Sequence, residues 1–126
     1  MTASKFRFVI IEKDSFVARD MQDGLQSVVP GCDIRRLCHP GQLSDHLADA
    51  SAGDARAVII TKLSLAQLDQ NGISQLARDR NAAIVVRLGE DSPQEVTARG
   101  WLSLASPFTW DDLAALAEEL SESCVE

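Results

Sequence analysis

The stretch Phe8-Val9-Ile10-Ile11-Glu12-Lys13-Asp14 consists of four apolar residues, three of them β-branched, followed abruptly by three charged residues. An uninterrupted apolar run of this length predicts a strand buried on both faces, as in a parallel sheet covered by helices. Two further runs of the same kind occur at Ala57–Ile60 and Ala83–Val86, and each is followed by a polar residue. We therefore expect a parallel sheet whose strands end in polar side chains at one edge.

The segment after the first run has the apolar spacing of an amphipathic helix that buries one face. Asp14 or Ser15 is the expected N-cap, and Pro30-Gly31 is expected to end the helix. The residues predicted to face inward recur at intervals of three and four: Phe16, Val17, Met21, Leu25 and Val28.

Weaker patterns complete five alternations of strand and helix, which predict an open, doubly wound parallel sheet with helices on both faces. We expect one α/β/α domain over residues 1–126, with a core at about 6–120 and a polar tail at 121–126. The remaining expected elements are strands at Ile34–Cys38 and Trp101–Ala105, a short helix at Gly41–Ala50 and about two helical turns at Pro93–Arg99. A further helix is expected within Ser64–Asp79, where Asn71-Gly72 could divide it. The last helix is expected to begin at Thr109, with Asp112 completing a capping box.

Composition narrows the classes of function. The chain of 126 residues has 12 Lys and Arg against 19 Asp and Glu, a net charge of −7, which disfavours nucleic-acid binding. No apolar run reaches the roughly 20 residues that a membrane span needs, so we expect a cytoplasmic protein with no membrane association. Cys32, Cys38 and Cys124 have no CxxC spacing, and with His39 and His46 they suggest neither a disulfide framework nor a metal site.

Ligands of open α/β sheets bind at the carboxyl ends of the strands, and in this chain the residues there resemble those of the response-regulator receiver domains of two-component signalling. In that family an acidic pair ends the first strand, the phosphoacceptor Asp ends the third, a Ser or Thr ends the fourth, and Lys-Pro-Phe follows the fifth. Glu12-Lys13 and Ser106-Pro107-Phe108 stand at the first and last of these positions. The resemblance covers Phe6 to about Leu120 and implies a flavodoxin-like (βα)5 fold.

The sequence keeps one member of the acidic pair, Glu12, and departs from the family at the other chemical positions. The phosphoacceptor position falls on Thr61, or on Lys62 if the strand ends one residue later, and Lys13 replaces a metal-binding carboxylate. Leu88 matches the Ser or Thr position, and Ser106 matches the Lys. Aspartyl phosphorylation needs a carboxylate nucleophile, a divalent ion and fixed donors for the developing charge. We therefore expect a pseudo-receiver that is not an enzyme, needs no cofactor and binds magnesium weakly or not at all.

Two local hypotheses follow for the strand ends. Lys13, with Asp14 nearby, is expected to lie in or over the former metal pocket and to pair with Glu12. The alternative is that Lys13 points to solvent. The resemblance also implies a cis peptide bond between Ser106 and Pro107.

The resemblance implies a stand-alone signalling module that binds another protein, such as a histidine kinase, a phosphotransfer protein or a transcriptional regulator, without being phosphorylated. Candidate contact residues are Trp101 and Trp110, although either ring could instead pack in the core. The family's aromatic switch position falls on Ser103, or on Trp101 after a local shift. In receivers the face formed by the fourth helix, the fifth strand and the fifth helix carries dimer and output contacts. The resemblance therefore also allows a homodimer on that face. The alternatives are an atypical phosphorelay component that uses an acceptor such as Asp14, and a flavodoxin-like module that binds a small molecule.

Overall fold

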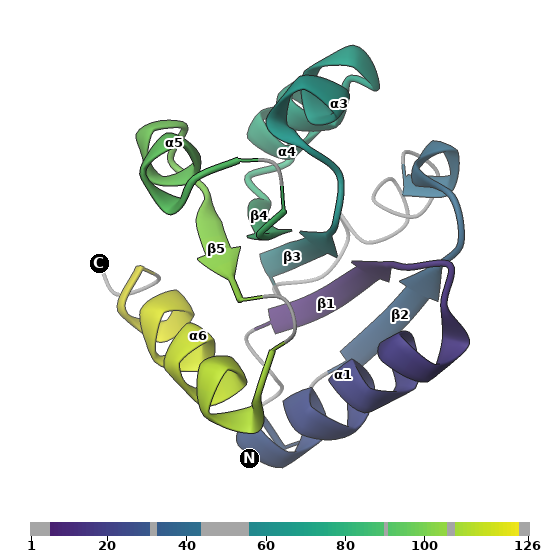
Figure 1. The fold of residues 1–126 in the computed structure, drawn as a ribbon, viewed down its shortest axis with the longest axis vertical. Coiled ribbons are helices and arrows are strands. Elements are labelled where there is room, and N and C mark those ends of the chain that lie inside the picture. The colour runs from purple at the N-terminus through teal and green to yellow at the C-terminus, as the bar shows by residue number, and fades with distance from the viewer. Residues whose placement is uncertain (1–5, 31–32, 44–55, 90, 106–107, 124–126) are drawn as a thin grey trace.

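The computed structural model describes residues 6–30, 33–43, 56–89, 91–105 and 108–123. Its strands form one five-stranded, all-parallel sheet with the order β2-β1-β3-β4-β5 (Figure 1). This is the flavodoxin-like order of a doubly wound sheet, so the predicted fold class is confirmed. The strands are β1 (Phe6–Ile11), β2 (Asp33–Leu37), β3 (Arg56–Thr61), β4 (Ala83–Arg87) and β5 (Leu102–Leu104).

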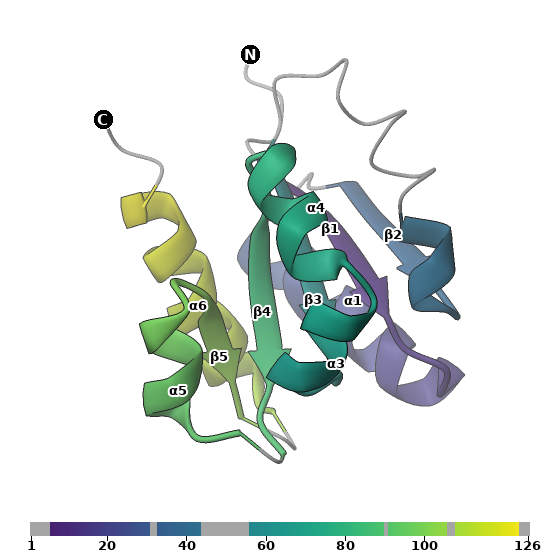
Figure 2. The ribbon, with the colours of Figure 1, turned by 90° about the horizontal axis from the view of Figure 1, so that it is seen from above.

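Helices cover both faces of the sheet and give three layers, as Figures 1 and 2 show. One face carries α1 (Ser15–Val28) and α6 (Trp110–Ser123), which contact each other. The other face carries α3 (Leu65–Gln70), α4 (Ile73–Asp79) and α5 (Pro93–Ala98). A 3-10 turn, η1 (Pro40–Gln42), follows β2.

The side chains of each central strand enter two separate cores because neighbouring residues of a strand point to opposite faces. Phe8 and Ile10 of β1 are buried in the core under α1 and α6. Val9 and Ile11 are buried in the core under α3, α4 and α5. The expectation of strands buried on both faces is therefore correct for this strand.

The local signals for the helix ends are also confirmed. The Asp14 side chain accepts hydrogen bonds from the backbone N–H groups of Phe16 and Val17, so Asp14 is the N-cap of α1. Gly72, which separates α3 from α4, has a φ of 73°, a conformation that glycine adopts without strain. Thr109 and Asp112 exchange the two hydrogen bonds of a capping box, at 2.8 and 3.1 Å.

Three expectations need correction or lie outside the described residues. Phe16 does not face inward: it is 86% exposed, because at 100° per residue it lies about 180° around α1 from the buried Leu25. The backbone of α6 continues to Ser123, so the helix extends into the expected polar tail. Gly41 and Gln42 belong to η1, and the rest of the helix expected over 41–50 lies largely outside the described residues.

None of the helices in the described ranges is long and apolar enough to cross a bilayer. Cys38 is an exposed free thiol, whereas Cys32 and Cys124 lie outside the described residues.

Candidate functional site at the carboxyl ends of the strands

The sheet brings the ends of β1, β3 and β4 to one corner. In the parallel register Ile11 pairs with Thr61, and Thr61 pairs with Val86. Glu12 directly follows β1 and Arg87 is the last residue of β4. The end of β3 lies between them, so the two side chains reach toward each other from either side of that strand. The sequence patterns predicted this convergence of strand ends, although they did not predict the pair that forms there.

Glu12 and Arg87 form an ion pair that is almost removed from solvent. Arg87 Nη1 donates to Glu12 Oε1, and the exposed fractions of the two side chains are 6% for Arg87 and 13% for Glu12. The second carboxylate oxygen of Glu12 accepts from the backbone N–H of Asp14 at 3.0 Å. Both oxygens of Glu12 are therefore engaged within the protein.

The guanidinium of Arg87 has a second neighbour at this corner. Its central carbon lies 5.7 Å from the centroid of the Phe108 ring, within the range of a cation–π interaction. Phe108 lies two residues before the start of α6, so one buried arginine links the end of β4 to the β1–α1 loop and to the segment that leads into α6.

A second arginine fixes the backbone of the β1–α1 loop. Arg36 Nε donates to the carbonyl oxygen of Glu12 at 3.0 Å, and its Nη2 donates to that of Lys13 at 2.8 Å. Asp14 then caps α1 with its own carboxylate. The carboxylates of Glu12, after the end of β1, and of Asp14, at the start of α1, thus both have hydrogen-bond partners within the chain.

The structure answers the hypothesis about Lys13. The counter-charge of Glu12 is Arg87, 75 residues away along the chain, and the side chain of Lys13 is exposed. The expected pairing of Lys13 with Glu12 is therefore wrong. A guanidinium provides a flat, forked set of donors that suits a carboxylate better than an ammonium does.

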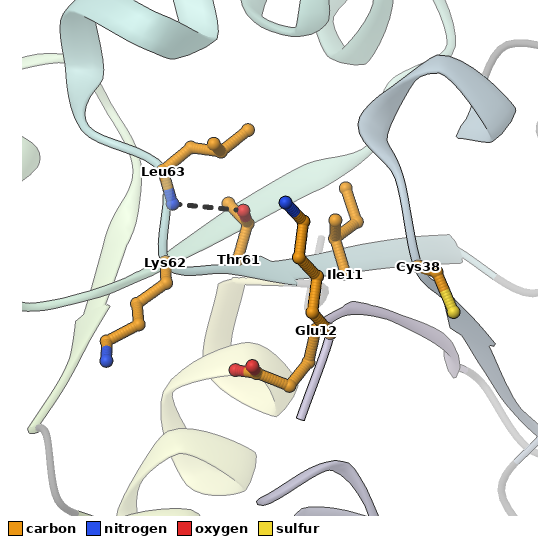
Figure 3. A pocket seen from close by; sticks show the side chains of 7 residues that line it. Ile11, Glu12, Cys38, Thr61, Lys62 and Leu63 are labelled. Carbon is orange, nitrogen blue, oxygen red and sulfur yellow. Dashed lines mark hydrogen bonds between the residues drawn. The ribbon is translucent and has the colours of Figure 1, made fainter. Parts of the chain in front are cut away.

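Thr61 closes β3 and is 1% exposed. Its Oγ1 accepts a hydrogen bond from the backbone N–H of Leu63 at 3.1 Å, which Figure 3 shows as a dashed line. This local bond turns the chain away from the strand toward α3. Lys62, at the alternative acceptor position, is exposed.

A cavity of about 200 Å³ opens beside these residues, between the ends of β1, β2 and β3 (Figure 3). Its charged residues are Glu12, which Arg87 neutralises, and two lysines. In Figure 3 the carboxylate of Glu12 points away from Cys38. The residues that line the cavity are Ile11, Glu12, Lys13, Cys38, Thr61, Lys62 and Leu63.

The remaining predicted site residues lie farther along the sheet. Leu88 follows the end of β4, where its backbone N–H donates to the carbonyl of Leu104 at 2.9 Å. Ser103 is half-buried in β5. Ser106 and Pro107 lie outside the described residues, so the predicted cis bond between them stays a prediction.

The two tryptophans differ in their surroundings. Trp101 is 8% exposed and packs in the core under α3, α4 and α5, where the Arg78 guanidinium lies 5.3 Å from its ring centroid. This burial favours the core interpretation of Trp101 over that of a surface contact. Trp110, at the first position of α6, is 50% exposed and is still a candidate for a contact with a partner.

Sequence reasoning placed Arg87 at a strand end and Phe108 in the last motif, but it missed the contacts that Arg87 makes with Glu12 and with the Phe108 ring. It also missed Arg36 and the exposure of Phe16. The one available signal was Arg87 itself, a charged residue that directly extends the apolar run Ala83–Val86. An arginine in that position needs a buried partner, because a buried charge is otherwise costly.

Within the described ranges, no group of three or more His, Cys, Asp or Glu side chains could hold a metal ion. In comparisons with known proteins, no family model matches the chain, and neither a curated protein nor a solved structure is a significant match.

Proposed function

We propose that this protein is a pseudo-receiver, a stand-alone signalling module that acts by protein–protein interaction in a two-component or phosphorelay context without being phosphorylated. The observation that carries the proposal is the buried Glu12–Arg87 pair at the corner where β1, β3 and β4 end. The proposal also rests on the receiver-like order of motifs in the sequence.

The pair supports the proposal through its effect on charge. Magnesium in a phosphoryl-transfer site needs free carboxylate oxygens, and here Arg87 and the backbone of Asp14 engage both oxygens of Glu12. For an ion to bind, it would have to displace a guanidinium that would then be buried without its counter-charge, which is strongly unfavourable.

The end of β3 supports the same conclusion. An acyl phosphate forms on a carboxylate, and the strand closes instead with Thr61, a buried residue whose hydroxyl bonds to the backbone. Asp14, the acceptor of the atypical alternative, holds the first turn of α1 with its carboxylate. Phosphorylation of Asp14 would remove that cap.

One observation favours a second candidate function, the binding of a small molecule. The cavity beside Thr61 has a mainly apolar wall, and Lys13 and Lys62 stand at it. Native mass spectrometry of the purified protein tests this candidate: a ligand that is released on denaturation would support it over a pure interaction module.

Incubation with magnesium and acetyl phosphate, followed by intact-mass measurement, tests the proposal. We expect no gain of a phosphoryl group under conditions that label an ordinary receiver run in parallel. A gain that fragmentation maps to Asp14 would instead establish the atypical phosphorelay function.

A further inference from the structure

An open groove of about 600 Å³ lies between the C-terminal end of α1 and the middle of α6, on the helical layer away from the strand-end site. Figure 1 shows the two helices side by side below the sheet. The groove has one charged residue, Glu118, and apolar walls. Its lining residues are Phe6, Val28, Val29, Pro30, Ala114, Ala117 and Glu118.

Trp110 extends this apolar surface along α6. Trp110, Ala114 and Ala117 are spaced by four and three residues and therefore share one face of the helix. The indole lies against α1 at Gly24, where a Cβ would stand 3.1 Å from Trp110 Nε1. Half of the Trp110 side chain is nevertheless exposed. A large aromatic ring next to small alanines leaves a shape that a bulky apolar residue of a partner can fill.

The two helices that border the groove are mostly acidic along their length, and Glu118 is the carboxylate among them that lines the groove itself. Counted with their capping residues, and over the side chains that the structure describes, α1 and α6 carry seven carboxylates and one arginine. The helices of the opposite layer, counted in the same way, carry three carboxylates and three arginines. The first set is Asp14, Asp20, Asp23, Asp111, Asp112, Glu118, Glu119 and Arg19, and the second is Asp69, Asp79, Glu95, Arg78, Arg80 and Arg99.

We infer that this groove is the docking site for a basic amphipathic helix of a partner protein. Helices that bind in grooves present one apolar stripe, and Glu118 together with the other carboxylates of α1 and α6 favours a helix whose flanks carry Lys or Arg. The inference rests on the proposed function, since it names the surface and the partner chemistry of that interaction.

Synthetic helical peptides test the inference on the full chain. One peptide has a leucine stripe flanked by lysines, and the matched peptide has the same stripe flanked by glutamates. We expect the lysine peptide to bind saturably, with amide NMR shifts concentrated at Val28, Val29 and Ala114, and the glutamate peptide to bind at least about tenfold more weakly.

A matched pair of variants separates the groove from general electrostatic attraction. Ala117→Arg fills the groove with a bulky cation, whereas Ala115→Arg adds the same charge to an exposed position of the same helix outside the groove. We expect Ala117→Arg to weaken the lysine peptide by about tenfold or more and Ala115→Arg by about threefold or less. Ala114→Arg is the second groove variant if Ala117→Arg does not fold.

Other outcomes overturn the inference. Equal losses of affinity for the lysine peptide in Ala115→Arg and Ala117→Arg would show that the attraction is unspecific. If neither peptide binds, the groove is not a docking site for such a helix. If light scattering shows that the wild type is a dimer and that Ala117→Arg is a monomer, the groove is occupied by a second copy of this chain. Binding that requires removal of residues 1–5 would identify the chain's own N-terminus. The acetyl phosphate experiment does not depend on the groove. If neither peptide binds and the chain also gains no phosphoryl group, the docking site is excluded but the proposed function is not.

Discussion

Replacement of Arg87 by methionine is expected to destabilise the protein severely, because it removes one partner of a buried ion pair and leaves the Glu12 carboxylate without its counter-charge. The two side chains are 6% and 13% exposed, so solvent screens the pair little. Loss of one partner of such a pair costs about 3–5 kcal/mol, and the contact with the Phe108 ring is part of that total. A loss near 3 kcal/mol corresponds to a fall in Tm of roughly 10–15 °C for a domain of this size.

Arg99→Met provides the matched control. Arg99 also forms an ion pair, with Asp69, at 3.0 Å, but those side chains are 37% and 47% exposed. Exposed pairs contribute little to stability because solvent screens the two charges. The same substitution at the two sites therefore separates burial from the mere presence of an ion pair.

Urea denaturation of the wild type, Arg87→Met, Glu12→Gln and the double variant measures the coupling. We expect the double variant to be more stable than the sum of the single losses predicts, by about 2–3 kcal/mol, because it leaves no buried charge without a partner. If Arg87→Met loses no more stability than Arg99→Met, or if the two losses at Arg87 and Glu12 add, the reasoning about the buried pair is refuted.

Two further predictions concern the packing of α1 against α6 and the exposed pair near α5. Gly24→Ala is expected to lower the free energy of unfolding by about 1 kcal/mol, since overpacking outweighs the gain in helix propensity. The new Cβ would stand 2.3 Å from Leu113 Cδ1 and 3.1 Å from Trp110 Nε1; a more stable variant in urea denaturation would contradict this. The hydrogen bond from Arg99 holds the pKa of the Asp69 carboxyl below its ordinary value. The ionised Asp69 therefore stabilises the folded protein above the pKa that the carboxyl has in the unfolded chain, about 4, and this stabilisation is lost as the pH falls through the lower pKa of the folded state. Carbon-detected NMR titration should show the pKa of Asp69 rise in Arg99→Ala, and an unchanged pKa would exclude Arg99 as the cause.

The sequence was sufficient for the sheet because its information is local. Phe8–Ile11, Ala57–Ile60 and Ala83–Val86 lie within β1, β3 and β4, and an apolar run bounded by polar residues allows few alternatives to a buried strand. The break at Asn71-Gly72 was equally local, since a glycine with positive φ ends one helix and starts another.

The site was less predictable because its decisive contacts join distant residues. Arg87 and Glu12 are 75 positions apart in the sequence. The position of a charged residue at a strand end does not indicate which residue it pairs with. Lys13 is the cation nearest to Glu12 in the sequence, yet its side chain is exposed. The fold instead brings the side chain of Arg87, from the end of β4, against Glu12. Phe16 shows a different limit, because intervals of three and four place a residue on a helix without fixing which of several apolar directions faces the core.

Amide NMR during a titration with magnesium and beryllofluoride tests the central claim most directly, because that combination mimics an acyl phosphate and needs both a metal site and an acceptor carboxylate. Because Arg87 pairs with Glu12 and Thr61 ends β3, we expect no shifts beyond those that an equal ionic strength of sodium chloride produces. Saturable shifts centred on Glu12, Asp14 and Thr61 would contradict it and would identify a working phosphorylation site at this corner of the sheet.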